Sequence, residues 1–130
     1  MTDVPLFLNG EGMAGGAVHH NIADCEFLGE VRTAAKYRFY SVRDEFPALK
    51  PVARGGVSVP GELYRVSLDV VRDRFMPAEP PELELGVIEL SDGTSALGVL
   101  LRPDHHQDPG LTDISDEGGW RAHTGRGRPA

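Results

Sequence analysis

Apolar and polar residues alternate over several short stretches of the chain, which is the pattern of half-buried β-strands. The clearest stretch is 37–42, where aromatic and β-branched residues recur at every second position. Pro51 cannot donate to a sheet ladder, so the stretch around it is expected at a sheet edge. Asp92-Gly93 between two apolar runs predicts a hairpin turn. Strands are predicted at residues 4–8, 37–42, 49–52, 57–66, 87–90 and 95–101.

One segment has helical rather than alternating spacing. Ser67 is suited to an N-cap, the apolar residues of 68–76 fall on one stripe, and Pro77 is expected to end the helix. Residues 18–22 predict a short helix or turn, and Gly29 predicts a break in the chain. Five or six short strands with one clear helix favour an α+β fold, as a small mixed barrel or a curled sheet.

The chain has the length of one domain and shows no internal repeat. We expect a single domain over residues 1–123 and a disordered tail over 124–130, which lacks apolar residues to anchor it apart from the terminal alanine. Just before that tail, Trp120 is the only tryptophan, which predicts a docked segment that closes the structure. Its neighbour Arg121 is expected to pair either with a ligand carboxylate or with one of the protein's acids.

Composition limits the classes of partner and site. A formal charge of −7 argues against nucleic-acid binding, and a single cysteine excludes an internal disulfide and a cysteine-based zinc site. No apolar run is long enough to span a bilayer and no signal peptide is seen, so we expect a cytoplasmic protein without membrane contact. The two histidine pairs at 19–20 and 105–106 each offer at most one ligand readily, so we expect neither a metal nor a cofactor.

A glycine-rich turn follows the first predicted strand, at residues 9–16. Glycine tolerates backbone angles that let successive N–H groups face one point, so this turn suits a small anion such as a carboxylate. It lacks the Gly-Lys-Ser/Thr ending of a phosphate loop. The alternative is a tight turn with no ligand.

The best candidates for a general base are three glutamates around two prolines: Glu79, Glu82 and Glu84. Apolar neighbours raise the pKa of a carboxyl group toward neutral pH, where a base works best. The alternative is a solvated acidic loop. Glu62 is a further candidate base or an ordinary cross-strand ion-pair partner, and His19 or His20 is a candidate proton carrier.

Several segments in this order resemble the C-terminal domain of allophanate hydrolase, which has the γ-glutamylcyclotransferase-like fold. The resemblance is carried by the combination of segments, above all by the final Asp-Ile-Ser and Gly-Gly-Trp-Arg. The segments are residues 33–40, 55–56, 61–64, 83–93, 113–115 and 118–121.

The resemblance implies an α+β fold in which a small mixed β-barrel is flanked by short helices, with a pocket between the first loop and a carboxylate. In cyclotransferases that loop grips the substrate through backbone groups, and residues 9–13 stand in its place here. Glu79 or Glu82 matches the cyclotransferase's catalytic glutamate, which follows the helix. With residues from the rest of the chain included, the substrate-binding residues that we expect are Asn9, Gly10, Glu11, Gly12, Met13, His19, Tyr40 and Arg121.

The sequence also departs from the resemblance. Asn9 stands where the allophanate hydrolase domain usually has a histidine, and the amidase half of that enzyme is absent, so this chain cannot hydrolyse allophanate alone. Two functions remain open. One is an enzyme that acts on a small carboxylate, amide or carbamate by glutamate-based proton transfer. The other is a non-catalytic accessory module that associates with a separately encoded amidase or with itself.

Overall fold

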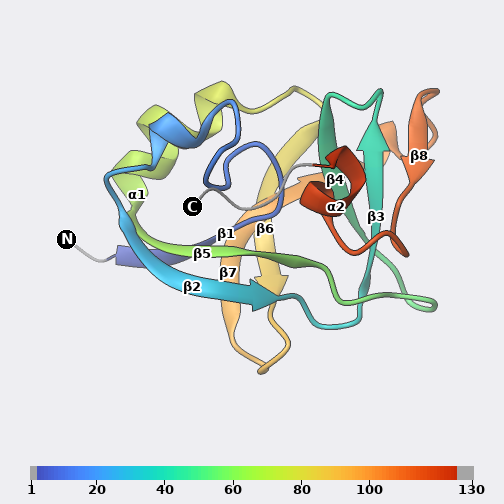
Figure 1. Cartoon of the computed structure of the whole chain (residues 1–130), viewed down its shortest axis with the longest axis horizontal. Helices are drawn as coiled ribbons and strands as arrows, with labels where there is room; N and C mark the ends of the chain where they lie inside the picture. The colour runs from blue at the N-terminus through green and yellow to red at the C-terminus, as the bar shows by residue number, and fades with distance from the viewer. Residues whose placement is uncertain (1–2, 126–130) are drawn as a thin grey trace.

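The computed structural model describes residues 3–125, in which eight strands form two sheets and the helices are short (Figure 1). The five-stranded sheet has the order β2-β5-β1-β7-β6, and the three-stranded sheet has the order β4-β3-β8. The strands are β1 (Asp3–Leu8), β2 (Glu26–Arg32), β3 (Tyr37–Val42), β4 (Phe46–Pro51), β5 (Pro60–Ser67), β6 (Leu83–Glu89), β7 (Ser95–Leu101) and β8 (Leu111–Asp113).

The first strand is the centre of the larger sheet. β1 pairs antiparallel with β5 and parallel with β7, so it is hydrogen-bonded on both edges. This position explains why Leu6, Phe7 and Leu8 form a continuous buried run rather than an alternating one. The loop that follows β1 therefore starts from the central strand of the sheet.

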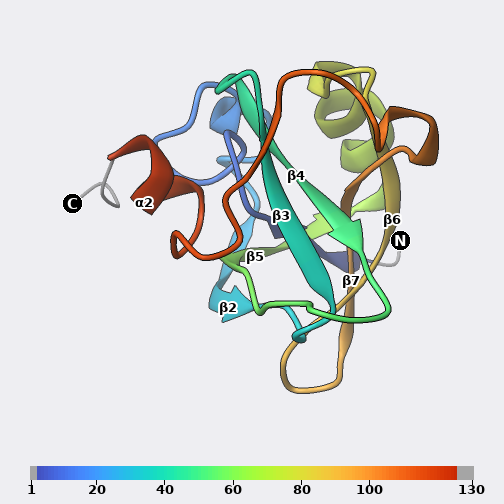
Figure 2. The ribbon, with the colours of Figure 1, turned by 90° about the vertical axis from the view of Figure 1, so that its right-hand side faces the viewer.

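The smaller sheet lies in front of the larger one when the molecule is viewed from the side of β3 and β4 (Figure 2). Its alternating strand β3 buries Tyr37 and Phe39 in the main core, which confirms the aromatic pattern in the sequence. The expected α+β class is confirmed, with the difference that the two sheets do not close into one barrel.

The helical segment after β5 begins at the predicted residue. Ser67 Oγ accepts a hydrogen bond from Val70 N at 3.2 Å, which is the N-cap bond expected there. The segment then continues one turn past the predicted end, because Pro77 occupies the first turn of a new 3₁₀ helix where its missing N–H costs nothing. It consists of α1 (Leu68–Val70), η2 (Val71–Phe75) and η3 (Met76–Ala78); the other helices are η1 (His19–Asn21), η4 (Pro103–His105) and α2 (Trp120–Thr124).

Several strand bounds differ from the prediction: β5 begins at Pro60 rather than at residue 57, and β6 begins at Leu83 rather than at residue 87. Two further predictions were wrong for identifiable reasons. Gly29 does not break the chain, because it lies in β2 at a bulge where the register with β5 shifts and where its φ is +130°. β4 begins at Phe46 rather than near residue 49, because the β3–β4 turn takes only residues 43–45, with positive φ angles at Arg43 and Asp44. Thr124, predicted to start a disordered tail, is the last residue of α2, and residues 126–130 lie outside the described part.

Candidate functional site

The glycine loop leaves β1 and folds back over the start of β4. Met13 N donates to Gly10 O at 3.1 Å, and Val18 N donates to Glu11 O at 3.1 Å, so the loop has a fixed shape. A Cβ on Gly10 would lie 2.6 Å from the ring of Pro47, which is too close for any other residue without movement. The glycine thus lets the start of β4 approach the loop.

A cavity of about 210 Å³ lies between this loop, the start of β4 and the chain after η3. Most of its wall is apolar, and its lining includes Asn9, Gly10, Glu11 and Gly12 on the loop side, Phe46 and Pro47 on the β4 side, and Ala78, Glu79 and Pro80 opposite. The structure therefore brings the predicted loop and one of the predicted glutamates to the same hollow.

Three acids line this cavity, and Glu79 is the candidate base among them. Glu11 accepts hydrogen bonds from Ala17 N and Trp120 Nε1, and Glu45 forms an ion pair with Arg43. Burial penalises the charged form of Glu79 and raises the pKa of its carboxyl to about 7. At neutral pH a carboxyl group of this kind exists in both protonation states, which suits a group that takes up and returns a proton. The sequence signal for this environment was the set of prolines around residue 79.

The two neighbouring glutamates are held elsewhere. Glu82 is buried and forms an ion pair with Arg43, whose Nη2 lies 3.0 Å from Glu82 Oε2. Glu84 lies 3.8 Å from Arg102 and is partly exposed. Neither is among the described residues that line the cavity with Glu79. The structure thus separates three acids that the sequence could not rank.

Glu62, which the sequence offered as a cross-strand partner or a second base, is fully buried beneath the glycine loop. It accepts hydrogen bonds from Ala14 N at 2.9 Å, Arg121 Nη2 at 2.9 Å and Tyr64 Oη at 3.1 Å. Burial by itself raises the pKa of Glu62, but these three bonds outweigh it and leave the pKa below its ordinary value. Glu62 is therefore a fixed anion that anchors the loop.

The C-terminal segment is docked on the same loop, as the lone tryptophan indicated. Trp120 is buried, and its Nε1 donates to Glu11 Oε2 at 2.6 Å. Arg121 Nη2 donates to Ala14 O at 2.8 Å as well as to Glu62. Of the two partners expected for Arg121, the structure shows the acid.

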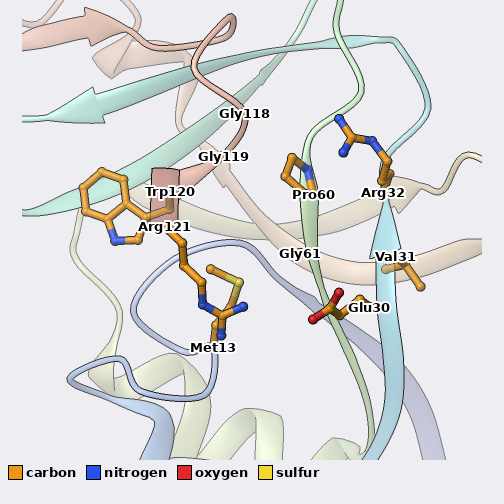
Figure 3. A pocket seen from close by; sticks show the side chains of 10 residues that line it. All are labelled: Met13, Glu30, Val31, Arg32, Pro60, Gly61, Gly118, Gly119, Trp120 and Arg121. Carbon is orange, nitrogen blue, oxygen red and sulfur yellow. The ribbon is translucent and has the colours of Figure 1, made fainter. Parts of the chain in front are cut away.

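A second and larger cavity, of about 420 Å³, lies on the other side of the loop. Arg121 and Met13 line this cavity rather than the one with Glu79 (Figure 3). The predicted substrate-binding residues are thus divided between two cavities, which no pattern in the sequence indicated.

The last two predicted binding residues lie outside the lining of either cavity within residues 3–125. His19 Nδ1 is 2.8 Å from Gly12 O, and its ring packs against Tyr64, so this side chain connects the glycine loop to β5. Tyr40 lies on β3 between Ala48 and Asp113. Within the same range, no group of three or more metal-ligating side chains gathers, and no helix has the length and apolar character to cross a membrane.

The sequence profile of the allophanate hydrolase C-terminal domain family matches residues 4–125. A uropathogenic E. coli-specific protein is 33% identical with a TM-score of 0.90, over 98% of this chain and 100% of that chain. Allophanate hydrolase from Kluyveromyces lactis is 24% identical with a TM-score of 0.87, over 96% of this chain and 21% of that chain. An AIG2-like protein from Mus musculus is 20% identical with a TM-score of 0.65, over 100% and 98% of the two chains. A search of curated proteins gave no match.

The family profile and the structural matches support different statements about this chain. The family profile covers nearly all of the described chain, including both cavities. The AIG2-like protein confirms the expected γ-glutamylcyclotransferase-like fold. The allophanate hydrolase match shows the same fold as one part of a chain about five times longer.

Proposed function

This chain belongs to the family of allophanate hydrolase C-terminal domains, and we propose that it binds a small carboxylate that carries an amide or carbamate group in the 210 Å³ cavity, where Glu79 transfers a proton. The observation that carries the proposal is the placement of a desolvated carboxyl group, with a pKa of about 7, opposite the glycine loop in one hollow.

The loop and the glutamate have complementary roles in this proposal. Backbone N–H groups of residues 9–12 hold the substrate's carboxylate, since Gly10 and Gly12 have no side chain in the way. The Glu11 carboxylate accepts hydrogen bonds from Ala17 N and Trp120 Nε1.

Glu79 accepts a proton from one bound water molecule as its oxygen attacks the amide or carbamate carbonyl carbon, and returns that proton to the nitrogen as the C–N bond breaks. The apolar walls from Phe46, Leu83 and Val99 keep bulk water out, which strengthens both interactions.

The cavity is small for a ligand site, since pockets for drug-sized ligands have volumes of roughly 300–1,000 Å³. At about 210 Å³ it suits a compact substrate such as malonamate or N-carbamoylglycine. Both molecules combine a carboxylate with an amide or ureido group and contain few atoms, so they are the first compounds to test.

We expect Glu79→Gln to lower turnover of a cavity substrate by about 100-fold or more, because the amide cannot accept the proton. Activity of the unmodified protein should rise with pH through about 7, as the Glu79 carboxyl loses its proton. The measurement is a rate assay with the two small amides. Glu84→Gln, on the same segment but outside the cavity lining, is the control and should leave the rate unchanged. Equal loss in both variants would contradict the role of Glu79.

A second candidate function is an accessory module for a separately encoded amidase. It is favoured by the similarity of this chain to only 21% of the K. lactis allophanate hydrolase chain. Two results together would support the module: co-purification of this protein with an amidase, and full amidase activity in the complex that contains the Glu79→Gln variant. Turnover of small amides by the isolated protein supports the enzyme.

A further inference from the structure

The larger cavity has a charge pattern that the proposed reaction does not use. It lies between β2, the start of β5 and the segment that leads into α2. Figure 3 shows the Glu30 carboxylate turned toward β5 at Gly61, with the Arg121 guanidinium on the other side of that strand. Gly61 belongs to the lining through its backbone alone, because a Cβ there would point toward β1, 2.3 Å from Leu8 O and 2.6 Å from the Phe7 ring. A cationic and an anionic group thus line one hollow.

We propose that this cavity is a second ligand site, which takes a small α-amino acid with an apolar side chain. In this arrangement the ligand's carboxylate binds Arg121 and its ammonium group binds Glu30. The volume of about 420 Å³ falls within the usual range for small-molecule sites, roughly 300–1,000 Å³.

Arg121 is suited to hold a carboxylate because it is already oriented. Its Nη2 group makes both of its bonds to the protein, one to Ala14 O and one to Glu62 Oε2. The N–H donors on Nε and Nη1 belong to the same rigid plane, so their direction is fixed before a ligand arrives. A fixed donor loses little conformational entropy on binding.

The balance of charge favours a zwitterion over a simple anion. Arg32 and Arg121 line the cavity with positive charge, while Glu30 lines it with negative charge and Glu62 lies behind Arg121. A zwitterion can pair its carboxylate with an arginine and its ammonium group with Glu30. A simple carboxylate can pair with the arginine but is repelled by Glu30. A carboxylate has several acceptor positions, so Glu30 can bind an ammonium group in addition to its contacts within the protein.

The rest of the wall is apolar and indicates the type of ligand side chain. Met13, Val31, Pro60 and Trp120 complete the lining around the charged residues. A branched aliphatic side chain gains from leaving water on such a wall. L-Leucine is therefore the probe, with 4-methylpentanoate lacking the ammonium group and 3-methylbutylamine lacking the carboxylate.

Trp120 gives a direct signal for the test, because it is the only tryptophan and lines the cavity. We expect L-leucine to change its fluorescence in a saturable manner and each of the two analogues to bind about tenfold more weakly or worse. Glu30→Gln should weaken L-leucine binding by about tenfold. Glu26→Gln, on the same strand but paired with Arg65 and outside the cavity lining, should bind like the unmodified protein.

Amide NMR shifts distinguish this site from the one proposed for catalysis. With L-leucine they should gather at residues 30–32, 61 and 118–121, and Glu79→Gln should leave the affinity unchanged. No saturable change with L-leucine, equal binding of L-leucine and 4-methylpentanoate, or shifts gathered around residues 9–12 and 78–79 would each overturn the inference. None of these results would contradict the proposed proton transfer by Glu79, which depends on the 210 Å³ cavity.

Discussion

Replacing Trp120 by alanine should lower the free energy of unfolding by about 3–5 kcal/mol. The indole is 2% exposed and belongs to the main core cluster, so its removal leaves a large cavity that the chain around it cannot easily fill. The same change removes the donor that Trp120 Nε1 provides to Glu11 Oε2. Urea unfolding followed by circular dichroism measures the loss.

A conservative variant separates the two contributions of this residue. Trp120→Phe keeps most of the buried ring but removes the bond to Glu11, so we expect a smaller loss of about 1–2 kcal/mol. The Trp120→Phe variant should also show faster amide hydrogen exchange over residues 10–18, because hydrogen bonds to Glu11 hold the loop in shape. A loss below about 0.5 kcal/mol for Trp120→Ala would show that the segment is not docked.

Replacing Glu62 by glutamine should lower the free energy of unfolding by about 3 kcal/mol. Removing one partner of a buried ion pair leaves the other charge uncompensated, and Arg121 is only partly exposed. The effect falls at the lower end of the range for such pairs because Arg121 keeps its bond to Ala14 O. Chemical unfolding measures it, with Glu30→Gln on the neighbouring strand as a control that should change stability little.

The pH dependence gives an independent check on Glu62. Its pKa in the folded protein lies below the ordinary value of 4.5, so its charge stabilises the folded state at higher pH. This stabilisation is fully present above pH 4.5 and is lost as the pH falls through the lowered pKa. The difference between the unmodified protein and Glu62→Gln should therefore shrink in acid. A difference that does not vary with pH would mean that the Glu62 charge is not what stabilises the loop.

Local sequence patterns predicted the parts of the fold that depend on local chemistry. The alternation of 37–42 identified β3, Ser67 identified the start of the helix, and Asp92-Gly93 identified the β6–β7 turn. The extent of β2 was missed because its bulge at Gly29 depends on pairing with β5, which is distant in the sequence. Whether the sheets close into a barrel depends on such pairings too.

The candidate site, too, was predicted from local sequence only in part. The glycine loop and a shielded glutamate were predicted from residue types, but choosing among three nearby glutamates requires knowing that Arg43 reaches Glu82 from the β3–β4 turn. The assignment of Arg121 to the other cavity likewise depends on where α2 docks. Phe46 and Pro47 form a wall of the first cavity, and nothing in their local sequence marks them as site residues.

The central claim is that a desolvated Glu79 and the loop at residues 9–12 form one ligand site. The most direct test is an NMR titration of the Glu79 side-chain carboxyl carbon, in the protein alone and with N-carbamoylglycine. We expect a midpoint near pH 7 in the protein alone. With the ligand, whose negative charge disfavours the glutamate anion, we expect a higher midpoint and shifted amide signals from residues 9–12. A midpoint near the ordinary value of 4.5 that does not move when the ligand is added would contradict the central claim.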